Sequence, residues 1–221
     1  MPAEEGVSEE VVVVVSGGDP PASGSALSVP PGTPVVAADR GLEHALALGL
    51  EVAIAVGDFD SASPEAVGVA EAAGVRIERH PAEKDATDLE LALDVAMQMC
   101  PRRILVLASR GGRQDHELAT LLLLGADRYS TAEIDASIGD AHVHVVRDQR
   151  TIRGKPGELI TLLAVNGPAV GVTTEGLAYP LRRDTLDPGS SRGVSNAFES
   201  EEARISVDDG VLLAIRPGRA E

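Results

Sequence analysis

Aromatic residues are scarce in this chain: they make up 2% of its 221 residues, and tryptophan is absent. The core must therefore be filled by valine, leucine, isoleucine and alanine. Apolar residues as a whole reach 43%, which is ample for one large domain or two small ones. A ligand that needs ring stacking finds few partners in such a chain.

Cysteine is nearly missing as well. Cys100 is the single one, so no internal disulfide forms, and no group of cysteine and histidine has zinc-binding spacing. Met1–Glu10 is acidic, and the apolar run Val11–Val15 is too short for a signal peptide or a membrane span. These features predict a soluble protein of the reducing cytoplasm.

Basic residues are outnumbered, with 19 Lys and Arg against 35 Asp and Glu and a formal net charge of -16. Nucleic acids and anionic membranes both need clustered Lys and Arg, so neither is expected as a partner. A phosphate compound would bind only where metal ions, backbone amides and a few well-placed cations offset the charge of the protein.

The first part of the chain alternates apolar strands with helices. Strands are predicted at Val11–Val15, Val35–Ala38, Val52–Val56, Val75–Arg79 and Ile104–Ala108, and helices after Asp39, from Pro64 behind a Ser63 cap, from Lys84–Glu90 and through Leu118–Leu124. Strands that are apolar throughout indicate a parallel sheet with helices on both faces. Such sheets bind ligands at the carboxyl ends of their strands.

The pattern changes beyond Asp140. Short strands are predicted at His142–Val146, Leu159–Val165, Val170–Val172, Gly193–Ser195, Ala203–Val207 and Val211–Ile215, with turn residues between them. The predicted fold is an α/β parallel-sheet, Rossmann-like domain at residues 1–138, followed by an all-β sandwich or jelly-roll domain at residues 139–221.

Two carboxylates follow the strand Val52–Val56. Asp58 and Asp60 are two residues apart, so in extended chain both side chains leave the same side of the strand end. Two like charges held together are costly unless a cation lies between them, and a hard divalent ion with oxygen ligands is the usual solution. An ordinary turn at Asp60–Ser61 is the structural alternative.

Two further acidic loops follow later strands. Asp85 and Asp88 could instead be an N-cap and a first-turn acid of a helix, and Arg113 and Asp115 could pair locally. Taken together, however, the three loops would meet at one edge of one sheet. That arrangement suits Mg²⁺ held by carboxylates and by the phosphates of a substrate.

These motifs resemble a known family. From about Val11 to Ile215, the chain resembles the thiamine pyrophosphokinase family in the order and spacing of its motifs. The motifs that match are Asp39, Gly57–Ser61, Lys84–Asp88, Gly111–His116, Gly176–Leu181 and Gly193–Asn196. The resemblance implies an enzyme that moves the β,γ-diphosphate of ATP to the hydroxyethyl oxygen of thiamine and releases AMP. It also implies a nucleotide-binding first domain, a thiamine-binding second domain, and a homodimer with thiamine between the subunits.

The resemblance further implies roles for individual residues. The catalytic residues would be Asp58, Asp60, Asp88, Arg113 and Asp115, with Asp58, Asp60 and Asp88 as Mg²⁺ ligands; Asp39, Arg40, Lys84, Asp85, Thr87 and Gly112 would bind ATP, and Ser195 and Asn196 would bind thiamine. Lys84 and Arg113 would neutralise phosphate charge, which dominates phosphoryl transfer. Asp60 or Asp88 would take the proton of the alcohol, and His116 is expected to be structural.

The chain departs from the family pattern at three places. Arg40 stands before Gly41 where the family usually has two glycines, so it adds a phosphate contact or narrows the nucleotide site. Ala108 replaces a common glycine, and the missing tryptophan leaves Phe198 or Tyr179 to stack on the substrate ring. Two alternatives therefore stay open. One is diphosphate transfer to another hydroxyalkyl heterocycle, such as a pterin or a pyrimidine, and the other is a non-catalytic module that binds nucleotide or thiamine diphosphate.

Overall fold

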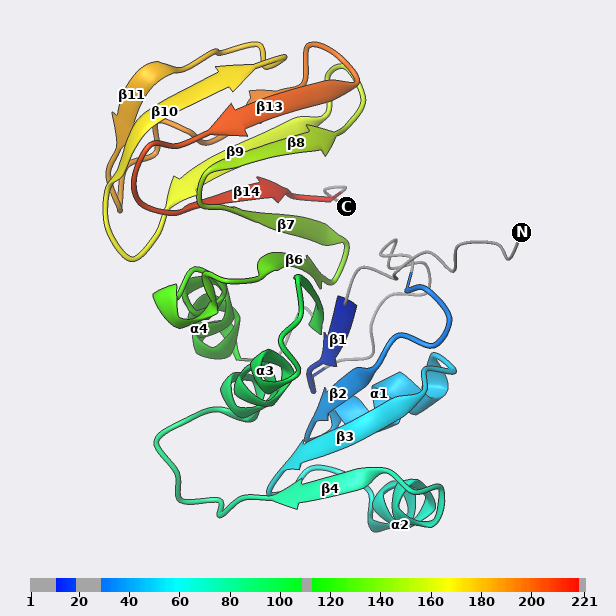
Figure 1. Cartoon of the computed structure of the whole chain (residues 1–221). Helices are drawn as coiled ribbons and strands as arrows, with labels where there is room; N and C mark the ends of the chain where they lie inside the picture. The colour runs from blue at the N-terminus through cyan, green and yellow to red at the C-terminus, as the bar shows by residue number, and fades with distance from the viewer. Residues whose placement is uncertain (1–10, 19–28, 109–112, 219–221) are drawn as a thin grey trace, which may run out of the picture. The chain divides into compact units, whose positions relative to one another are not determined.

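The computed structural model describes residues 11–18, 29–108 and 113–218, which form two compact units (Figure 1). The first unit takes in the described residues up to 108 together with 131–139, and the second takes in 113–130 together with the described residues from 140 onward. The sequence placed all of 1–138 in the first domain. The contacts group the segment 113–130 with the β-rich unit, where Asn166 Nδ2 donates a hydrogen bond to Leu122 O at 3.2 Å and Gly125 lies against Val165. The domain boundary after residue 138 stays a prediction.

The first unit is built on six parallel strands. Its strands are β1 (Val11–Val15), β2 (Val35–Ala38), β3 (Val52–Gly57), β4 (Arg76–Arg79), β5 (Arg103–Ala108) and β6 (Glu133–Ile138), in the order β6-β5-β1-β2-β3-β4. Each neighbouring pair is parallel, which confirms the predicted sheet type. The direction in which the strands follow one another across the sheet reverses beside β1, as it does in doubly wound sheets. In the Rossmann fold the strand order is 3-2-1-4-5-6.

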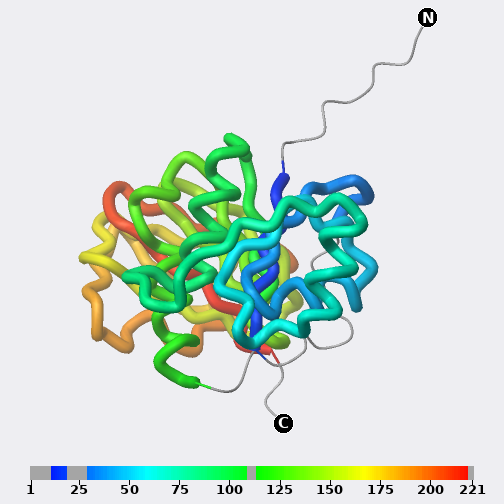
Figure 2. The backbone as a smooth tube through the Cα atoms, turned by 90° about the horizontal axis from the view of Figure 1, so that it is seen from below, coloured from blue at the N-terminus to red at the C-terminus, as the bar shows by residue number. Residues whose placement is uncertain are grey.

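Helices cover both faces of this sheet. They are α1 (Gly41–Ala47), α2 (Pro64–Ala72) and α3 (Asp88–Gln98). Leu42 of α1 and Val67 of α2 share one core cluster with Ala37 and Ala55 of the sheet. In Figure 1, α3 lies in front of the strands and α1 behind them, and Figure 2 shows the turns of residues 41–72 on one side of β1. The predicted covering of both faces is confirmed.

Strand β6 was not predicted, because the polar Asp135 interrupts its apolar pattern. The Asp135 side chain is fully buried, and Arg103 of the neighbouring β5 donates to it from Nε at 2.8 Å. A buried carboxylate is tolerated only with such a partner. The sixth strand therefore depends on an ion pair that no single segment of the sequence reveals.

The second unit contains two antiparallel sheets. In the first, the strands follow the order β12 (Asn196–Ala197), β9 (Leu159–Ala164), β14 (Leu212–Arg216) and β7 (Ala141–Val146). In the second, they follow the order β11 (Arg182–Leu186), β10 (Ala169–Glu175), β13 (Glu202–Ser206) and β8 (Gln149–Arg153). The helices α4 (Gln114–Leu124) and η1 (Asp127–Tyr129) also belong to this unit. Ile160 and Leu162 of the first sheet share one core cluster with Val172 and Ile205 of the second. The unit is thus a β-sandwich, as predicted.

The sandwich differs from the prediction in four details. The segment 193–195 forms a turn instead of a strand, since Ser195 has φ +58 and Val194 N donates to Ser191 O at 3.0 Å. Strands β8 and β11 were not predicted because each has few apolar residues, and the two-residue strand β12 was not predicted either.

No helix within the described ranges is long and apolar enough to cross a membrane.

Candidate active site

The loop after β3 carries the first two acidic residues of the site. Between Asp58 and Asp60, Phe59 adopts φ +58 and buries its ring in the cluster under α1 and α2. The Arg79 guanidinium lies over that ring, 5.2 Å from its centroid. The backbone N–H of Asp60 donates to Asp58 Oδ1 at 3.2 Å. The buried ring thus anchors the loop and holds the two flanking carboxylates at the end of β3.

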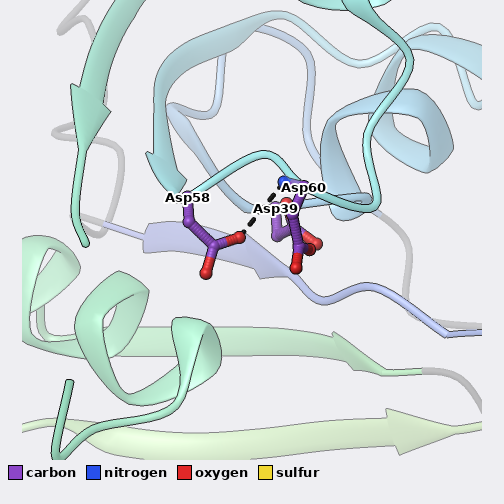
Figure 3. A group of neighbouring side chains, drawn as sticks. All are labelled: Asp39, Asp58 and Asp60. Carbon is purple, nitrogen blue, oxygen red and sulfur yellow. Dashed lines mark hydrogen bonds between the residues drawn. The ribbon is translucent and has the colours of Figure 1, made fainter. Parts of the chain in front are cut away.

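Asp39 joins this pair. It follows β2 with φ +47, and its backbone N–H donates to Val56 O at 2.8 Å. One carboxylate oxygen each of Asp39, Asp58 and Asp60 lies within 4.8 Å of the other two (Figure 3). The prediction that Asp58 and Asp60 lie together is confirmed. Sequence reasoning assigned Asp39 to the nucleotide and missed it here, although β2 and β3 are neighbours whose carboxyl ends share one edge.

The two oxygens of Asp39 differ in environment. Oδ2 accepts a hydrogen bond from Ser61 Oγ. Oδ1 is buried and has no hydrogen-bond partner among the described residues. A buried carboxylate oxygen without a partner is costly, and a divalent cation between the three aspartates would satisfy it. The donor set therefore fits a hard metal ion such as Mg²⁺.

Lys84 lies beside the group and contacts two acids. Its Nζ is 3.0 Å from Asp58 Oδ2 and 2.8 Å from Asp88 Oδ1. The hydrogen bond from Lys84 is the main cause that lowers the pKa of Asp58. Burial alone would lower the pKa of Lys84, but its hydrogen bonds to Asp88 and Asp58 outweigh burial and raise it. The negative charge of Asp58 in turn raises the pKa of Asp60.

Gly57 makes room for this arrangement. A Cβ on Gly57 would lie 3.1 Å from Asp39 Cβ and 3.2 Å from Asp88 Oδ1, and its φ of +151 is rarely adopted by other residues. Only glycine therefore allows Asp39 and Asp88 to approach the end of β3 this closely.

The start of α3 supplies Asp88. Thr87 is the N-cap, since its hydroxyl accepts from Glu90 N at 3.2 Å, and Asp88 is the first helical residue. The alternative in which Asp85 caps the helix is wrong, because Thr87 occupies the N-cap position and Asp85 lies two residues before it in the loop. The alternative of Asp88 as a first-turn acid is confirmed, and that position also brings it to Lys84.

The remaining predicted nucleotide residues are distributed differently. Arg40 is the N-cap residue of α1, and its half-exposed side chain lies 3.8 Å from Glu43. Gly112 lies outside the described residues. Arg113 and Asp115 belong to the second unit and pair with each other at 2.6 Å, which confirms the local pairing considered from the sequence. Their role toward a nucleotide stays a prediction.

The predicted thiamine residues lie in the second unit. Ser195 is exposed, and its backbone N–H donates to Thr161 Oγ1 at 3.1 Å. Asn196 is buried, and its side-chain amide hydrogen-bonds the backbone of Tyr179. Tyr179 is 71% exposed, whereas Phe198 is 2% exposed and packs against Gly154. Of the two aromatic residues considered for stacking, Tyr179 is thus the accessible one.

Family models match both parts of the chain. Residues 32–135 match the model described as thiamin pyrophosphokinase, catalytic domain, and residues 142–212 match the model described as thiamin pyrophosphokinase, vitamin B1 binding domain. The chain belongs to the thiamine pyrophosphokinase family. The resemblance stated from the motifs is therefore confirmed.

Individual thiamine pyrophosphokinases are similar over most of the chain. The protein from Bacillus subtilis is 28% identical over 183 residues, which are 82% of this chain and 86% of that protein. Thiamine pyrophosphokinase 1 from rice is 30% identical over 173 residues, or 72% of this chain and 64% of that protein. The crystal structure of the Bacillus subtilis enzyme has a TM-score of 0.81 at 25% identity, covering 95% of this chain and all of that one.

Proposed function

We propose that this member of the thiamine pyrophosphokinase family transfers the β,γ-diphosphate of ATP to the hydroxyethyl oxygen of thiamine, giving thiamine diphosphate and AMP. The observation that carries the proposal is the match of a catalytic and a vitamin B1 binding model, in that order, on one chain. The group of Asp39, Asp58 and Asp60 supports it, because diphosphate transfer needs a site that can hold a divalent cation.

The nucleotide would bind at the carboxyl edge of the parallel sheet, beside the order reversal at β1, where open α/β sheets take their ligands. Mg²⁺ would be held there by Asp39, Asp58 and Asp60, whose hard oxygen atoms suit it. When bound, the ion neutralises charge on the transferred diphosphate. Asp88, predicted as a further ligand, lies 2.8 Å from Lys84 Nζ.

Protein side chains would supply the rest of the chemistry. Lys84, and Arg113 as predicted from the family, offset the negative charge of the phosphates. The hydroxyl proton of thiamine needs an acceptor within hydrogen-bond reach. Of the two candidates, Asp60 is exposed while Asp88 is paired with Lys84, so we assign this role to Asp60.

A panel of acceptors tests the proposal. With ATP and Mg²⁺, thiamine should give AMP and thiamine diphosphate in equal amounts, and ADP as the nucleotide product would contradict it. The missing tryptophan favours a second candidate, diphosphate transfer to a hydroxyalkyl pterin or another pyrimidine. Faster AMP formation with such an acceptor than with thiamine would establish that candidate instead.

A non-catalytic binding module is the third candidate. The variant Asp60→Asn separates it from an enzyme, since it keeps the size and shape of the side chain and removes its charge. If the protein is an enzyme, this variant should lose AMP formation while its circular dichroism spectrum and unfolding midpoint stay those of the parent. Unchanged AMP formation would remove Asp60 from the mechanism.

We also propose a cytoplasmic homodimer, on the support of the single cysteine and of the family resemblance. Light scattering coupled to size-exclusion chromatography tests the dimer. The expected mass is twice the 22.8 kDa of one chain, and a mass of 22.8 kDa would contradict the proposal.

A further inference from the structure

A side chain of α1 holds the start of α2. Glu43 lies in the first turn of α1, and its Oε1 accepts a hydrogen bond from the backbone N–H of Ser63 at 2.6 Å. A short bond is expected because the acceptor is a carboxylate. Ser63 is the N-cap residue of α2 and ends the loop that begins with Asp58. Glu43 therefore fixes the end of that loop to α1.

The sequence at the start of α2 explains why a carboxylate from another helix is needed there. In a capping box, the N-cap hydroxyl accepts from the N–H of the third helical residue, and a Glu or Gln at that third position reaches back to the N–H of the N-cap residue. Ser63 Oγ accepts from Ala66 N at 3.3 Å, so the first half of the box is present. The third helical residue is Ala66, whose methyl group cannot reach back. Glu43 supplies the second half instead.

The bond from Ser63 to Glu43 closes a ring of contacts. Glu43 follows Asp39 by four residues, at the start of the same helix. Ser61, two residues before Ser63, donates from its Oγ to Asp39 Oδ2. The ring thus runs from Asp39 through α1 to Glu43, on to the loop, and back to Asp39. It ties the carboxyl end of β2 to the loop that follows β3.

The ring encloses the carboxylates of Asp39, Asp58 and Asp60, which we call the three-aspartate group (Figure 3). The buried ring of Phe59 anchors the loop near its beginning, and Glu43 anchors it at its end. A loop fixed at both points keeps Asp60 close to Asp39.

We propose that Glu43 is a positioning residue for the three-aspartate group: by holding Ser63 N it sets the place of the loop opposite Asp39, and so sets the affinity of the group for a divalent cation. The inference rests on the proposed function for the nature of the group as one that handles Mg²⁺. Glu43 acts through the backbone of the loop and not as a ligand.

The surroundings of Glu43 favour this role. Its Oε2 lies 3.8 Å from Arg40 Nε, and the two side chains are 31% and 50% exposed. An ion pair with that separation and exposure contributes little. The bond to Ser63 N is the stronger of the two contacts, so the position of the loop is what a change at Glu43 should alter.

Titration of Mn²⁺ into the full chain, without ATP or thiamine, tests the inference. Electron paramagnetic resonance of the free ion gives the dissociation constant. Glu43→Ala should raise this constant about threefold to tenfold, less than the loss of a partner in direct contact with a metal ligand, which costs about tenfold to 100-fold. Glu43→Gln keeps an oxygen that can accept from Ser63 N, so it should retain most of the affinity.

Glu43→Asp separates reach from charge. It keeps the charge, but its side chain is shorter by one methylene and withdraws from Ser63 N. The Mn²⁺ affinity should therefore be lower in Glu43→Asp than in Glu43→Gln. This pair of variants also covers the case in which Glu43→Ala does not fold.

Ser63→Ala is the matched structural control. It removes the other half of the same cap and keeps the backbone N–H that Glu43 binds. Urea unfolding should show that Glu43→Ala and Ser63→Ala both destabilise the protein, whereas the Mn²⁺ affinity should fall in Glu43→Ala alone. An effect through the stability of α2 would lower the affinity equally in both and would overturn the inference.

A double-mutant cycle tests the ring itself. Ser61→Ala opens it at Asp39, and Glu43→Ala opens it at Ser63. Because either change opens the ring, the double variant should lose less binding free energy than the sum of the two single losses. Additive losses would mean that the two residues act independently, which contradicts the inference.

Three further results would overturn it: the parent affinity in Glu43→Ala, an affinity in Glu43→Gln as low as in Glu43→Asp, or no Mn²⁺ binding by the parent chain. Failure of the proposed function would be seen separately, because absent AMP formation with thiamine leaves the Mn²⁺ affinities as measured.

Discussion

The side-chain amide of Asn196 holds the backbone of Tyr179 on both sides. Its Oδ1 accepts from Tyr179 N at 3.0 Å, and its Nδ2 donates to Tyr179 O at 2.8 Å. Asn196 is 5% exposed, while the Tyr179 ring stands in solvent. The buried amide therefore fixes the chain from which an accessible aromatic ring projects, in a protein that has two tyrosines and no tryptophan.

This arrangement predicts that Tyr179 stacks on the acceptor ring. Tyr179→Ala should raise the KM for thiamine about fivefold, since an aromatic pair contributes about 1 kcal/mol. Tyr179→Phe should retain the KM because it keeps the ring face. The measurement is steady-state kinetics with thiamine varied at saturating ATP.

Phe198→Leu is the control for Tyr179. The Phe198 ring is buried in the sandwich core, so this variant should lower the free energy of unfolding and leave the KM for thiamine unchanged. A larger rise in the KM for thiamine in Phe198→Leu than in Tyr179→Ala would show that the exposed ring is not the stacking group.

Ser61 is predicted to position Asp39, since its hydroxyl donates to Asp39 Oδ2. Ser61→Ala should raise the Mg²⁺ concentration needed for half-maximal AMP formation by about tenfold, as expected for a residue that orients a metal ligand. Ser63→Ala is the matched control, because Ser63 caps α2 through Ala66 N. It should cost about 1 kcal/mol of stability without changing the Mg²⁺ requirement. The reverse pattern would remove Ser61 from the site.

Gly57 is predicted to be indispensable for activity. A methyl group there would push against Asp39 and Asp88 and would strain the backbone at φ +151. Gly57→Ala should therefore lower kcat, by less than the roughly 100-fold that a misplacement of 1 Å costs. Gly68 in α2 has open space around it, and Gly68→Ala should instead stabilise the fold by about 0.4–1 kcal/mol. A Gly57→Ala enzyme with the parent kcat would contradict the close approach of the two acids.

His142 is predicted to make stability depend on pH. Burial, and next the positive charge of Arg216, lower its pKa from 6.5. The unfolded chain then binds the proton more readily than the folded chain, so stability is lost as the pH falls below about 6.5 toward the folded pKa. When the pH is lowered from about 8 to about 5.5, the free energy of unfolding measured with urea should fall less in His142→Gln than in the parent. Equal losses would assign the acid sensitivity to other groups.

Much of the fold could be predicted because its signals are local. The apolar strands β1, β2 and β5 lie where their sequences indicate, and Ser63 with Pro64 marks the start of α2. The missed elements depend on partners distant in sequence. Strand β6 tolerates Asp135 only because Arg103 pairs with it, and the chain passes so close to Leu162 O at residue 193 that a Cβ on Gly193 would lie 2.1 Å from that oxygen.

The site was predictable to a similar extent. The pair Asp58 and Asp60 is close in sequence, and its spacing predicted that the two carboxylates lie together. Asp39 reaches them only through the register of β2 beside β3. The contact of Lys84 with both Asp58 and Asp88 depends on the path of the loop before α3, which no periodicity specifies.

The fate of the β-phosphorus of ATP tests the central claim most directly. ATP labelled with ³²P at the β position is incubated with the protein, Mg²⁺ and thiamine, and the products are separated. Diphosphate transfer predicts that all the transferred label appears in thiamine diphosphate and that the AMP is unlabelled. Label recovered in ADP, with thiamine monophosphate as the other product, would show transfer of a single phosphoryl group and contradict the account.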